Sequence, residues 1–156
     1  MDNVEIAQVF ENIAKLLEAQ GENPYKIRAY QRVAPEVRNL PELAEIAEAH
    51  QLRTVPGVGA EIEKKIEEML ATGHLMYYEN LLAQFPDGFM TLMDLPGVGP
   101  KLAARLHKGL GIGTVADLES ALEDGRVGTV SGLGPKTVEN LQQALETYRS
   151  RTAPSR

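Results

Sequence analysis

Three short glycine motifs hold the residues of this sequence whose types and spacing could do chemistry. Each motif consists of five residues: an apolar residue, a proline or small residue, a glycine, a second apolar residue and a second glycine. An expected helix follows each motif. The three glycine pairs are Gly57 and Gly59, Gly97 and Gly99, and Gly132 and Gly134. Glycine permits positive φ and a close approach of the backbone, and the N–H groups and dipole at a helix start favour an anion. The motifs therefore predict backbone sites for phosphate groups.

The repetition of the motif bears on how it is interpreted. A single copy is equally well explained as a tight connection between two helices. Three copies in one frame favour anion binding, with Gly97 following Gly57 by 40 residues and Gly132 following Gly97 by 35. A dinucleotide-binding loop is disfavoured, because no strand is expected before any of the motifs.

A basic helix face is expected directly behind the second motif. Lys101, Arg105 and Lys108 follow i, i+4, i+7 spacing, and residues 101–113 contain no acidic residue and carry a local charge of +3. Side chains at this spacing share one face of a helix, which could follow the phosphates of a DNA strand. An ordinary solvated helix face is the alternative. Lys136 repeats the position of Lys101 behind the third motif.

The overall charge at first argues against a nucleic-acid partner. The chain has 156 residues with 22 acidic and 16 basic side chains, which gives a formal net charge of −6. The charge is unevenly distributed, however. Residues 21–40 carry +2, residues 101–113 carry +3 and residues 129–156 carry +2, so that the remaining segments together carry −13. Local basic segments can therefore bind a polyanion although the whole chain is acidic.

Composition excludes several classes of site. The absence of cysteine excludes disulfides and thiolate zinc sites, and the three histidines are too scattered for a metal site. No apolar run approaches the ~18 residues of a membrane span, and the N-terminus lacks the pattern of a signal peptide. We therefore expect a cytoplasmic monomer without membrane contact, associated with the nucleoid if the source is bacterial.

Short helices are the expected elements throughout. Aromatic residues make up 5% of the chain and tryptophan is absent, whereas alanine, glutamate and leucine dominate between the glycines and prolines. The expected helices run from a cap at Asp2 or Asn3 to Gly21, then from a cap at Asn23 with a first-turn proline over Tyr25–Arg38, and over Glu42–Gln51, Glu61–Ala71, Leu75–Gln84, Phe89–Met93, Pro100–Leu110, Val115–Leu122 and Pro135–Tyr148. The turn-rich stretch Phe85–Gly88 separates them into two groups. The sequence therefore predicts an all-α fold of two small helical subdomains.

The glycine motifs resemble the helix-hairpin-helix motif, which binds the DNA backbone without sequence specificity. The stretches Asn23–Ala34, Val55–Gly59 and Ile66–Gly73 together resemble the N-terminal region of family X DNA polymerases, and the similarity continues through the other two motifs. The resemblance implies a lyase-like helical domain over 1–84, a fingers-type domain over 88–150 and a tail over 151–156. It also implies binding of gapped or nicked DNA or of 5′-phosphate ends in DNA repair.

Polymerisation is not expected from this chain alone. In the family a palm domain follows the fingers, and its carboxylates hold the two metal ions that nucleotidyl transfer needs. The chain contains no Asp-x-Asp pair of that kind. We therefore expect Mg²⁺ only if a palm domain follows in a longer protein.

The resemblance also implies an enzymatic activity for the first domain. In the family a lysine amine attacks C1′ of a 5′-deoxyribose phosphate, forms a Schiff base and promotes β-elimination. Aligning the first motif without gaps places Lys65 at this nucleophile. Helix spacing agrees, because Lys65 flanks the apolar stripe of its helix and is the more desolvated lysine, while Lys64 lies nearly opposite the stripe. The alternative is a lysine whose stem merely covers apolar surface.

The phosphate pocket of such a lyase is only partly reproduced. Lys26 and Tyr30 match pocket residues of the family and, four residues apart, share one helix face, and Arg53 is a basic match just before the first motif. Glu61 stands where a lysine occurs in the family, and its carboxylate would repel a phosphate unless an arginine or lysine pairs with it. An active lyase and a DNA-binding module without lyase activity are therefore both left open.

A monovalent cation, Na⁺ or K⁺, is a further implication of the resemblance. In the family, carbonyl oxygens of the hairpin hold the ion, which bridges to a DNA phosphate. The matching positions are Arg53, Val55 and Val58 for the first motif, and Met93, Leu95 and Val98 for the second. Main-chain ligands leave no side-chain signature, so these positions come from the resemblance alone.

A non-enzymatic protein-interaction domain is the alternative to DNA binding. Helix-hairpin-helix folds also serve in protein contacts, and the net charge of −6 favours a protein partner. The three motifs and the basic segment behind the second motif favour DNA. We therefore expect a DNA-binding module that contacts backbone phosphates.

Overall fold

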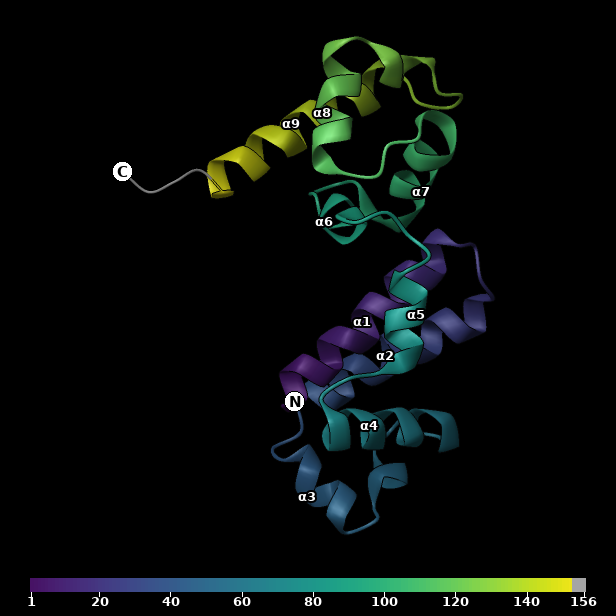
Figure 1. Ribbon diagram of the computed structural model, residues 1–156, viewed down its shortest axis with the longest axis vertical. Coiled ribbons are helices and arrows are strands. Elements are labelled where there is room, and N and C mark those ends of the chain that lie inside the picture. The colour runs from purple at the N-terminus through teal and green to yellow at the C-terminus, as the bar shows by residue number, and fades with distance from the viewer. Residues whose placement is uncertain (153–156) are drawn as a thin grey trace. The chain divides into compact units, whose positions relative to one another are not determined.

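Helices make up the regular structure of the chain in the computed structural model, which describes residues 1–152 (Figure 1). The elements in chain order are α1 (Asn3–Ala19), α2 (Pro24–Arg38), α3 (Leu43–Glu48), η1 (Leu52–Thr54), α4 (Ala60–Thr72), α5 (Met76–Leu82), α6 (Phe89–Met93), α7 (Gly99–Leu110), α8 (Val115–Glu123), η2 (Arg126–Thr129) and α9 (Pro135–Thr152). No strand occurs among the described residues, so the predicted all-α fold is confirmed. None of these helices is both long and apolar enough to cross a membrane.

The chain divides into two compact units, Met1–Gln84 and the residues from Phe85 onward. The division falls at the turn-rich stretch before α6, where Gly88 has a φ of 87°. Each unit buries apolar side chains of its own.

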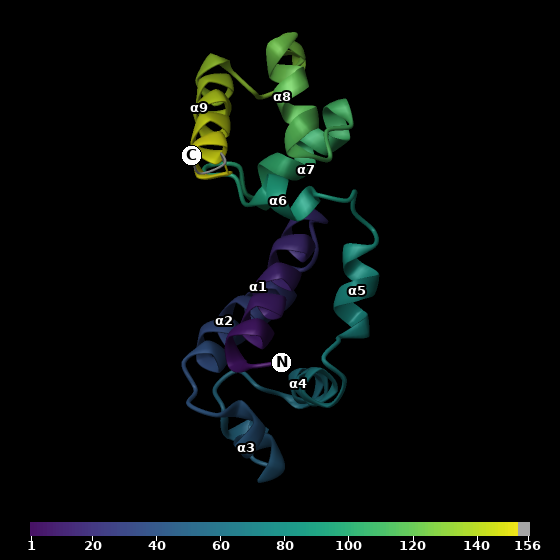
Figure 2. The ribbon, with the colours of Figure 1, turned by 60° about the vertical axis from the view of Figure 1, so that its left-hand side comes forward.

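The core of the first unit lies where α1 packs along α2. Ile6, Phe10, Ile13 and Leu17 repeat at helical spacing on α1, and none of them is more than 2% exposed. Figure 2 shows α1 alongside α2, and the ring centroid of Phe10 lies 5.9 Å from that of Tyr30 on α2. Each such buried side chain contributes about 1.5–3 kcal/mol to stability. The packing thereby fixes where α2 places Tyr30.

Both predicted caps of these helices are confirmed. Asp2 accepts a hydrogen bond from the N–H of Glu5 at 2.8 Å, and the Glu5 carboxylate accepts one from the N–H of Asp2 at 3.3 Å. Asn23 accepts from the N–H of Tyr25 at 2.8 Å, and Pro24 is the first residue of α2. Side chains thus satisfy N–H groups at the start of each helix that have no partner within it.

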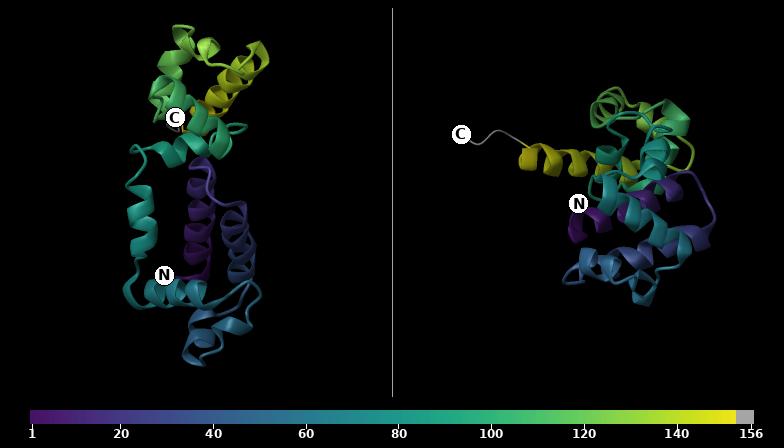
Figure 3. Two further views of the ribbon diagram at one scale, coloured as in Figure 1. Left: turned by 90° about the vertical axis from the view of Figure 1, so that its right-hand side faces the viewer. Right: turned by 60° about the horizontal axis from the view of Figure 1, so that its bottom comes forward.

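The second unit has its core among α6, α7 and α8. Phe89, Leu92, Leu106 and Leu118 come from these three helices and are at most 1% exposed. Figure 3 shows the three helices, in teal and green, with the yellow α9 in the same unit.

The start of α8 is tied to the preceding turn by Asp117. Its carboxylate accepts hydrogen bonds from the N–H of Gly113 at 3.0 Å and of Thr114 at 3.2 Å, while the Thr114 hydroxyl accepts from the N–H of Asp117 at 3.1 Å. These donors stabilise the charged carboxylate and hold the pKa of Asp117 below its usual value, the N–H of Gly113 having the largest effect.

The three glycine motifs fold into the same turn, and we call them hairpins 1, 2 and 3 (residues 55–59, 95–99 and 130–134). The N–H of the second apolar residue donates to the carbonyl of the first, from Val58 to Val55 at 3.0 Å, from Val98 to Leu95 at 3.0 Å and from Leu133 to Val130 at 3.1 Å. The first glycine of each pair lies in the left-handed region, with φ of 87° at Gly57, 80° at Gly97 and 83° at Gly132. This is the third position of a type II turn, which requires positive φ. The second glycines differ, because Gly99 has a φ of 69° and Gly59 one of −99°.

The end of α3 was predicted too late in the chain. The helix ends at Glu48 because His50 takes a φ of 57°. The N–H groups of His50 and Gln51 donate back to the carbonyls of Ala47 and Ile46, each at 3.0 Å. These two bonds form a Schellman-type helix end. Glycine is the usual residue at that position, so the sequence carried no signal for it.

The last helix was predicted too short. α9 continues past Tyr148 to Thr152, so Arg151, expected in the tail, is helical. Residues 153–156 of the predicted tail lie outside the described residues. The 3-10 helices η1 and η2 were not predicted, because three or four residues are too few to show a period.

We predict that Gly57→Ala destabilises the first unit by about 1–2 kcal/mol, because a residue with a Cβ is strained in the left-handed region. Gly59→Ala is the matched control, since φ there is −99° and a Cβ would meet nothing within 4 Å. Its expected cost is about 0.5 kcal/mol, that of a weaker N-cap. Denaturant unfolding measures both, and equal losses would contradict the turn geometry.

Candidate functional site

Three side chains of the first unit converge on the ring of Tyr77. The Nζ atom of Lys65, on α4, lies 4.7 Å from the ring centroid of Tyr77, on α5, and the Nζ atom of Lys26, on α2, lies 5.6 Å from it. The ring of Tyr30, also on α2, stacks against that of Tyr77 at 6.3 Å with an interplanar angle of 15°. We call these four residues the aromatic–lysine cluster. It brings together three of the residues expected at the lyase site.

Tyr30 anchors the cluster in the core. Its side chain is 4% exposed and packs between the rings of Phe10 and Tyr77. Burial raises the pKa of Tyr30 well above its usual value, and the neighbouring Tyr77 and the charge of Glu61 raise it further. The phenol of Tyr30 is therefore neutral at every physiological pH.

The two neighbouring lysines of α4 differ in exposure. Lys65 is half-buried and Lys64 is exposed, which is the difference that helix spacing predicts. Glu61 is exposed one turn before Lys65 on the same helix, and its charge reaches Tyr30. The Lys65 amine therefore lies near an aromatic ring that the Lys26 ammonium also approaches, and Glu61 lies one turn earlier on the same helix.

Arg53 makes a different contact from the one expected of a pocket residue. Its Nε lies 3.2 Å from a carboxylate oxygen of Glu63, and its side chain is 62% exposed. Glu63 thus compensates the charge of Arg53 locally. An exposed ion pair of this kind contributes only about 0–1 kcal/mol to stability. Arg53 can therefore leave Glu63 for an anion that binds it more strongly.

The carbonyl groups expected to hold a cation take part in the hairpin turns. The carbonyl oxygens of Val55 and Leu95 each accept the N–H of the residue three positions later, at 3.0 Å. A carbonyl oxygen has two lone pairs, so each keeps one for another ligand. Among the described residues no cluster of three or more histidine and carboxylate side chains could hold a metal ion. The cation positions at Arg53, Val55, Val58, Met93, Leu95 and Val98 stay predictions.

The basic face of α7 is exposed behind hairpin 2, but its three residues are not equivalent. Lys101, Arg105 and Lys108 are all exposed. Arg105 is hydrogen-bonded to hairpin 3, where its Nη2 donates to the carbonyl of Ser131 at 2.6 Å. Gly132 leaves the space for this contact, because a Cβ there would collide with the guanidinium of Arg105. Arg105 therefore ties hairpin 3 to α7.

The contact from Arg105 occupies part of the turn in hairpin 3. Gly134 and Lys136 lie exposed at the start of α9, as expected for a phosphate site. The tip of the hairpin, at Ser131, is already contacted by the Arg105 guanidinium. The helical spacing predicted that Arg105 shares a DNA-binding face with Lys101 and Lys108. Nothing in the sequence indicated its contact with Ser131.

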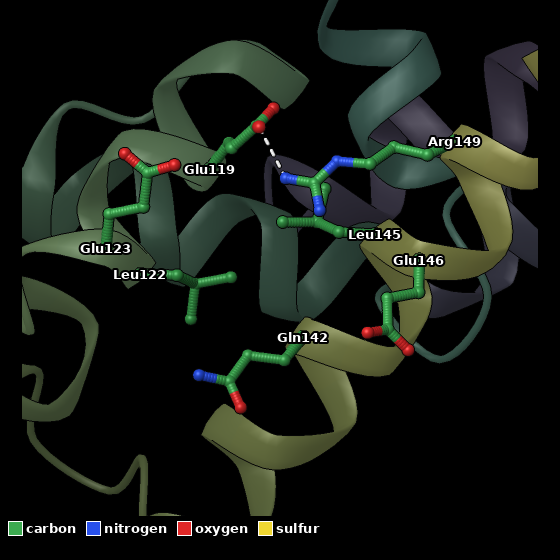
Figure 4. Close-up of a pocket in the computed structure, with 7 residues that line it drawn as sticks. All are labelled: Glu119, Leu122, Glu123, Gln142, Leu145, Glu146 and Arg149. Carbon is green, nitrogen blue, oxygen red and sulfur yellow. Dashed lines mark hydrogen bonds and ion pairs between the residues drawn. The ribbon is translucent and has the colours of Figure 1, made fainter. Parts of the chain in front are cut away.

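The face formed by α8 and α9 does not suit a polyanion. Figure 4 shows a hollow between these helices in which Arg149 pairs with Glu119 and in which Glu123 and Glu146 also lie. Three carboxylates and one guanidinium leave this surface acidic. Arg149 is thus engaged with a carboxylate.

Tyr77 is the functional candidate that sequence reasoning missed. It lies on an expected helix, but neither charge nor helical period distinguished it from Tyr78. The two differ in their contacts, since Tyr78 accepts a hydrogen bond from the side-chain amide of Asn12 at 3.0 Å, whereas Tyr77 faces the lysines.

We predict that Arg105→Ala destabilises the second unit by about 0.5–1.5 kcal/mol, because the Ser131 carbonyl loses a charged donor. Lys108→Ala removes an exposed cation from the same helix and should change stability by less than about 0.5 kcal/mol. Thermal unfolding of the two variants gives the comparison. If Arg105→Ala were as stable as Lys108→Ala, the contact would contribute nothing to the fold.

Comparisons with known proteins identify the hairpins. Residues 1–75 match the family described as a helix-hairpin-helix domain, and residues 89–147 match the family described as a SAM-like helix-hairpin-helix tandem. The chain is 30% identical over 132 residues to the DNA polymerase/3′-5′ exonuclease PolX of Bacillus subtilis (strain 168). The alignment covers 85% of this chain and 23% of that relative, so the chain spans about a quarter of the relative's length. The two family matches contain all three glycine motifs.

Proposed function

Because this chain consists of helix-hairpin-helix domains of the kind found in family X DNA polymerases, we propose that it is the DNA-binding module of such an enzyme. It binds gapped or nicked DNA and 5′-phosphate ends through backbone phosphates, without sequence specificity. The observation that carries the proposal is hairpin 2, whose left-handed Gly97 leads directly into α7 with exposed Lys101 and Lys108.

The physical basis of this binding is local rather than global. The N–H groups at the start of α7 attract a phosphate oxygen, and the two lysines on the same helix can contact neighbouring phosphates of the strand. A net charge of −6 weakens long-range attraction but does not abolish contacts made within a Debye length of about 10 Å. The acidic face of α8 and α9 remains available for a protein partner, which is the alternative function.

We predict that the double substitution of Lys101 and Lys108 by alanine lowers the affinity for gapped duplex DNA roughly tenfold. It should also reduce the magnitude of the slope of log affinity against log salt concentration by about 2. Binding releases about one counterion for each phosphate contact, and the variant makes two such contacts fewer. Fluorescence anisotropy at several salt concentrations measures both. Lys64→Ala, which removes an exposed lysine of the first unit, should leave the slope unchanged. No affinity for DNA at low salt would favour the protein-partner function instead.

A second function, 5′-deoxyribose phosphate lyase activity, is supported by the aromatic–lysine cluster. The Lys65 nitrogen bonds to C1′ of the open-chain sugar aldehyde, and the aldehyde oxygen leaves as water. Loss of a proton from C2′ then breaks the C3′–O3′ bond, which releases the downstream strand with its 5′-phosphate. Hydrolysis of the imine returns the lysine. Lys26 would contact the substrate phosphate, while Glu61 opposes it.

We predict that borohydride traps a covalent adduct between the protein and incised abasic DNA, and that Lys65→Ala lowers its yield at least about tenfold, because trapping requires the imine at that amine. Lys64→Ala, on the exposed side of the same helix, is the matched control and should trap as the parent chain does. Gel analysis of labelled DNA gives the yields. A Lys65→Ala variant that still traps fully would exclude Lys65 as the nucleophile.

The proposal includes a Na⁺ or K⁺ ion at hairpins 1 and 2. It would be held by main-chain carbonyls and would bridge to a DNA phosphate, and the unused lone pairs of the Val55 and Leu95 carbonyls support this. Mg²⁺ would belong to the palm domain of a longer enzyme. The module acts as a monomer in the cytoplasm, on nucleoid DNA if the source is bacterial.

A further inference from the structure

The ring of Tyr77 is the meeting point of three helices of the first unit. α5 supplies the ring, α4 brings Lys65 to 4.7 Å from its centroid, and α2 brings Lys26 to 5.6 Å. Both distances are within the range of about 6 Å in which an ammonium group is attracted to the negative face of an aromatic ring. One ring therefore restrains two lysine side chains that are far apart in the sequence.

An aromatic ring holds a lysine differently from a carboxylate. In an ion pair, such as that of Arg53 with Glu63, the cation donates hydrogen bonds to a charged acceptor. The face of a ring attracts the ammonium group without taking its proton and without covering the nitrogen with an acceptor. The nitrogen held in this way keeps its position and, once its proton has passed to solvent, its lone pair can bond to an electrophilic carbon.

The orientation of the Tyr77 ring is set from the core. Tyr77 stacks on Tyr30 at 15°, and Tyr30 packs against Phe10, which is fully buried on α1. The row Phe10, Tyr30, Tyr77 thus connects the α1–α2 packing to the amine of Lys65.

We propose that Tyr77 is a positioning residue that holds Lys65, in preference to its neighbour Lys64, as the amine that forms the imine. The inference rests on the proposed lyase function. In the step concerned, the Lys65 nitrogen bonds to C1′ and the aldehyde oxygen leaves as water. Borohydride then delivers hydride to the imine carbon and a solvent proton goes to nitrogen, so that the adduct is a secondary amine at Lys65.

Substitution of Tyr77 on the full chain tests the role of the ring. Tyr77→Phe keeps the ring and removes the hydroxyl, and should trap abasic DNA within about twofold of the parent chain. Tyr77→Leu removes the ring and should lower the trapping rate about tenfold, a loss typical of a misplaced reacting group. Peptide mapping of its adducts should show them spread over Lys65, Lys64 and Lys26 rather than concentrated at Lys65.

Tyr78→Leu is the matched control on the same helix. It removes a half-buried tyrosine and its hydrogen bond with Asn12 but not the ring beneath the lysines. It should trap at the parent rate, with the adduct at Lys65. Thermal unfolding of all three variants identifies any loss of fold, which would affect Tyr78→Leu as well as Tyr77→Leu.

The ring contact also has a readout that needs no reaction. A methylene group near an aromatic face experiences the ring current, so the Cε protons of Lys65 and Lys26 should resonate upfield of those of Lys64 in NMR spectra of the DNA-free chain. The shift should persist in Tyr77→Phe and disappear in Tyr77→Leu.

Three results would overturn the proposal, and they are distinguishable. Unshifted lysine signals in the parent chain would show that the lysines do not contact the ring. Shifted signals in the parent chain together with full trapping at Lys65 in Tyr77→Leu would show that Tyr77 has no positioning role and would leave the lyase function intact. Shifted signals with no adduct in the parent chain would exclude the lyase function and, with it, a role for Tyr77 in imine formation.

Discussion

The left-handed glycine in each hairpin is the constraint on which both units depend. The type II turn of each hairpin requires positive φ at its third residue, and Gly57, Gly97 and Gly132 all take it. The apolar residue that follows this glycine, Val58, Val98 or Leu133, is buried in each hairpin, and the next helix begins just after it. A side chain at that glycine would be strained, so the core and the surface proposed to bind phosphate are set by the same backbone geometry.

The charge of the chain is organised around these turns. Basic side chains gather on α7 behind hairpin 2, whereas α8 carries acidic ones, so the second unit has two faces of opposite sign. Phosphate contacts of this kind rely on oriented N–H groups and a few nearby lysines, and both act over short distances. An acidic protein can therefore present a surface suited to DNA. Within that surface Arg105 contributes to the fold, since its guanidinium joins α7 to hairpin 3.

The aromatic–lysine cluster shows how the core of the first unit reaches the surface. Packing of α1 on α2 fixes Tyr30, and Tyr30 fixes the ring of Tyr77. The ring attracts the two ammonium groups of Lys26 and Lys65, a role that carboxylates could also fill in an acidic chain. A carboxylate would bind a lysine more strongly but would also repel the phosphate of the proposed substrate, as Glu61 would on α4. A neutral ring avoids that repulsion.

The sequence by itself determined the helices, the caps at Asp2 and Asn23, the hairpins and the greater burial of Lys65 than of Lys64, because each depends on residues within one or two turns. The resemblance to a known family indicated that Lys26, Tyr30 and Lys65 belong to one site. Only the tertiary structure decided that they meet on Tyr77, that Arg105 reaches Ser131, and that α3 ends at a left-handed His50. These contacts join segments distant in the sequence or depart from the usual residue preference, so no local pattern encodes them.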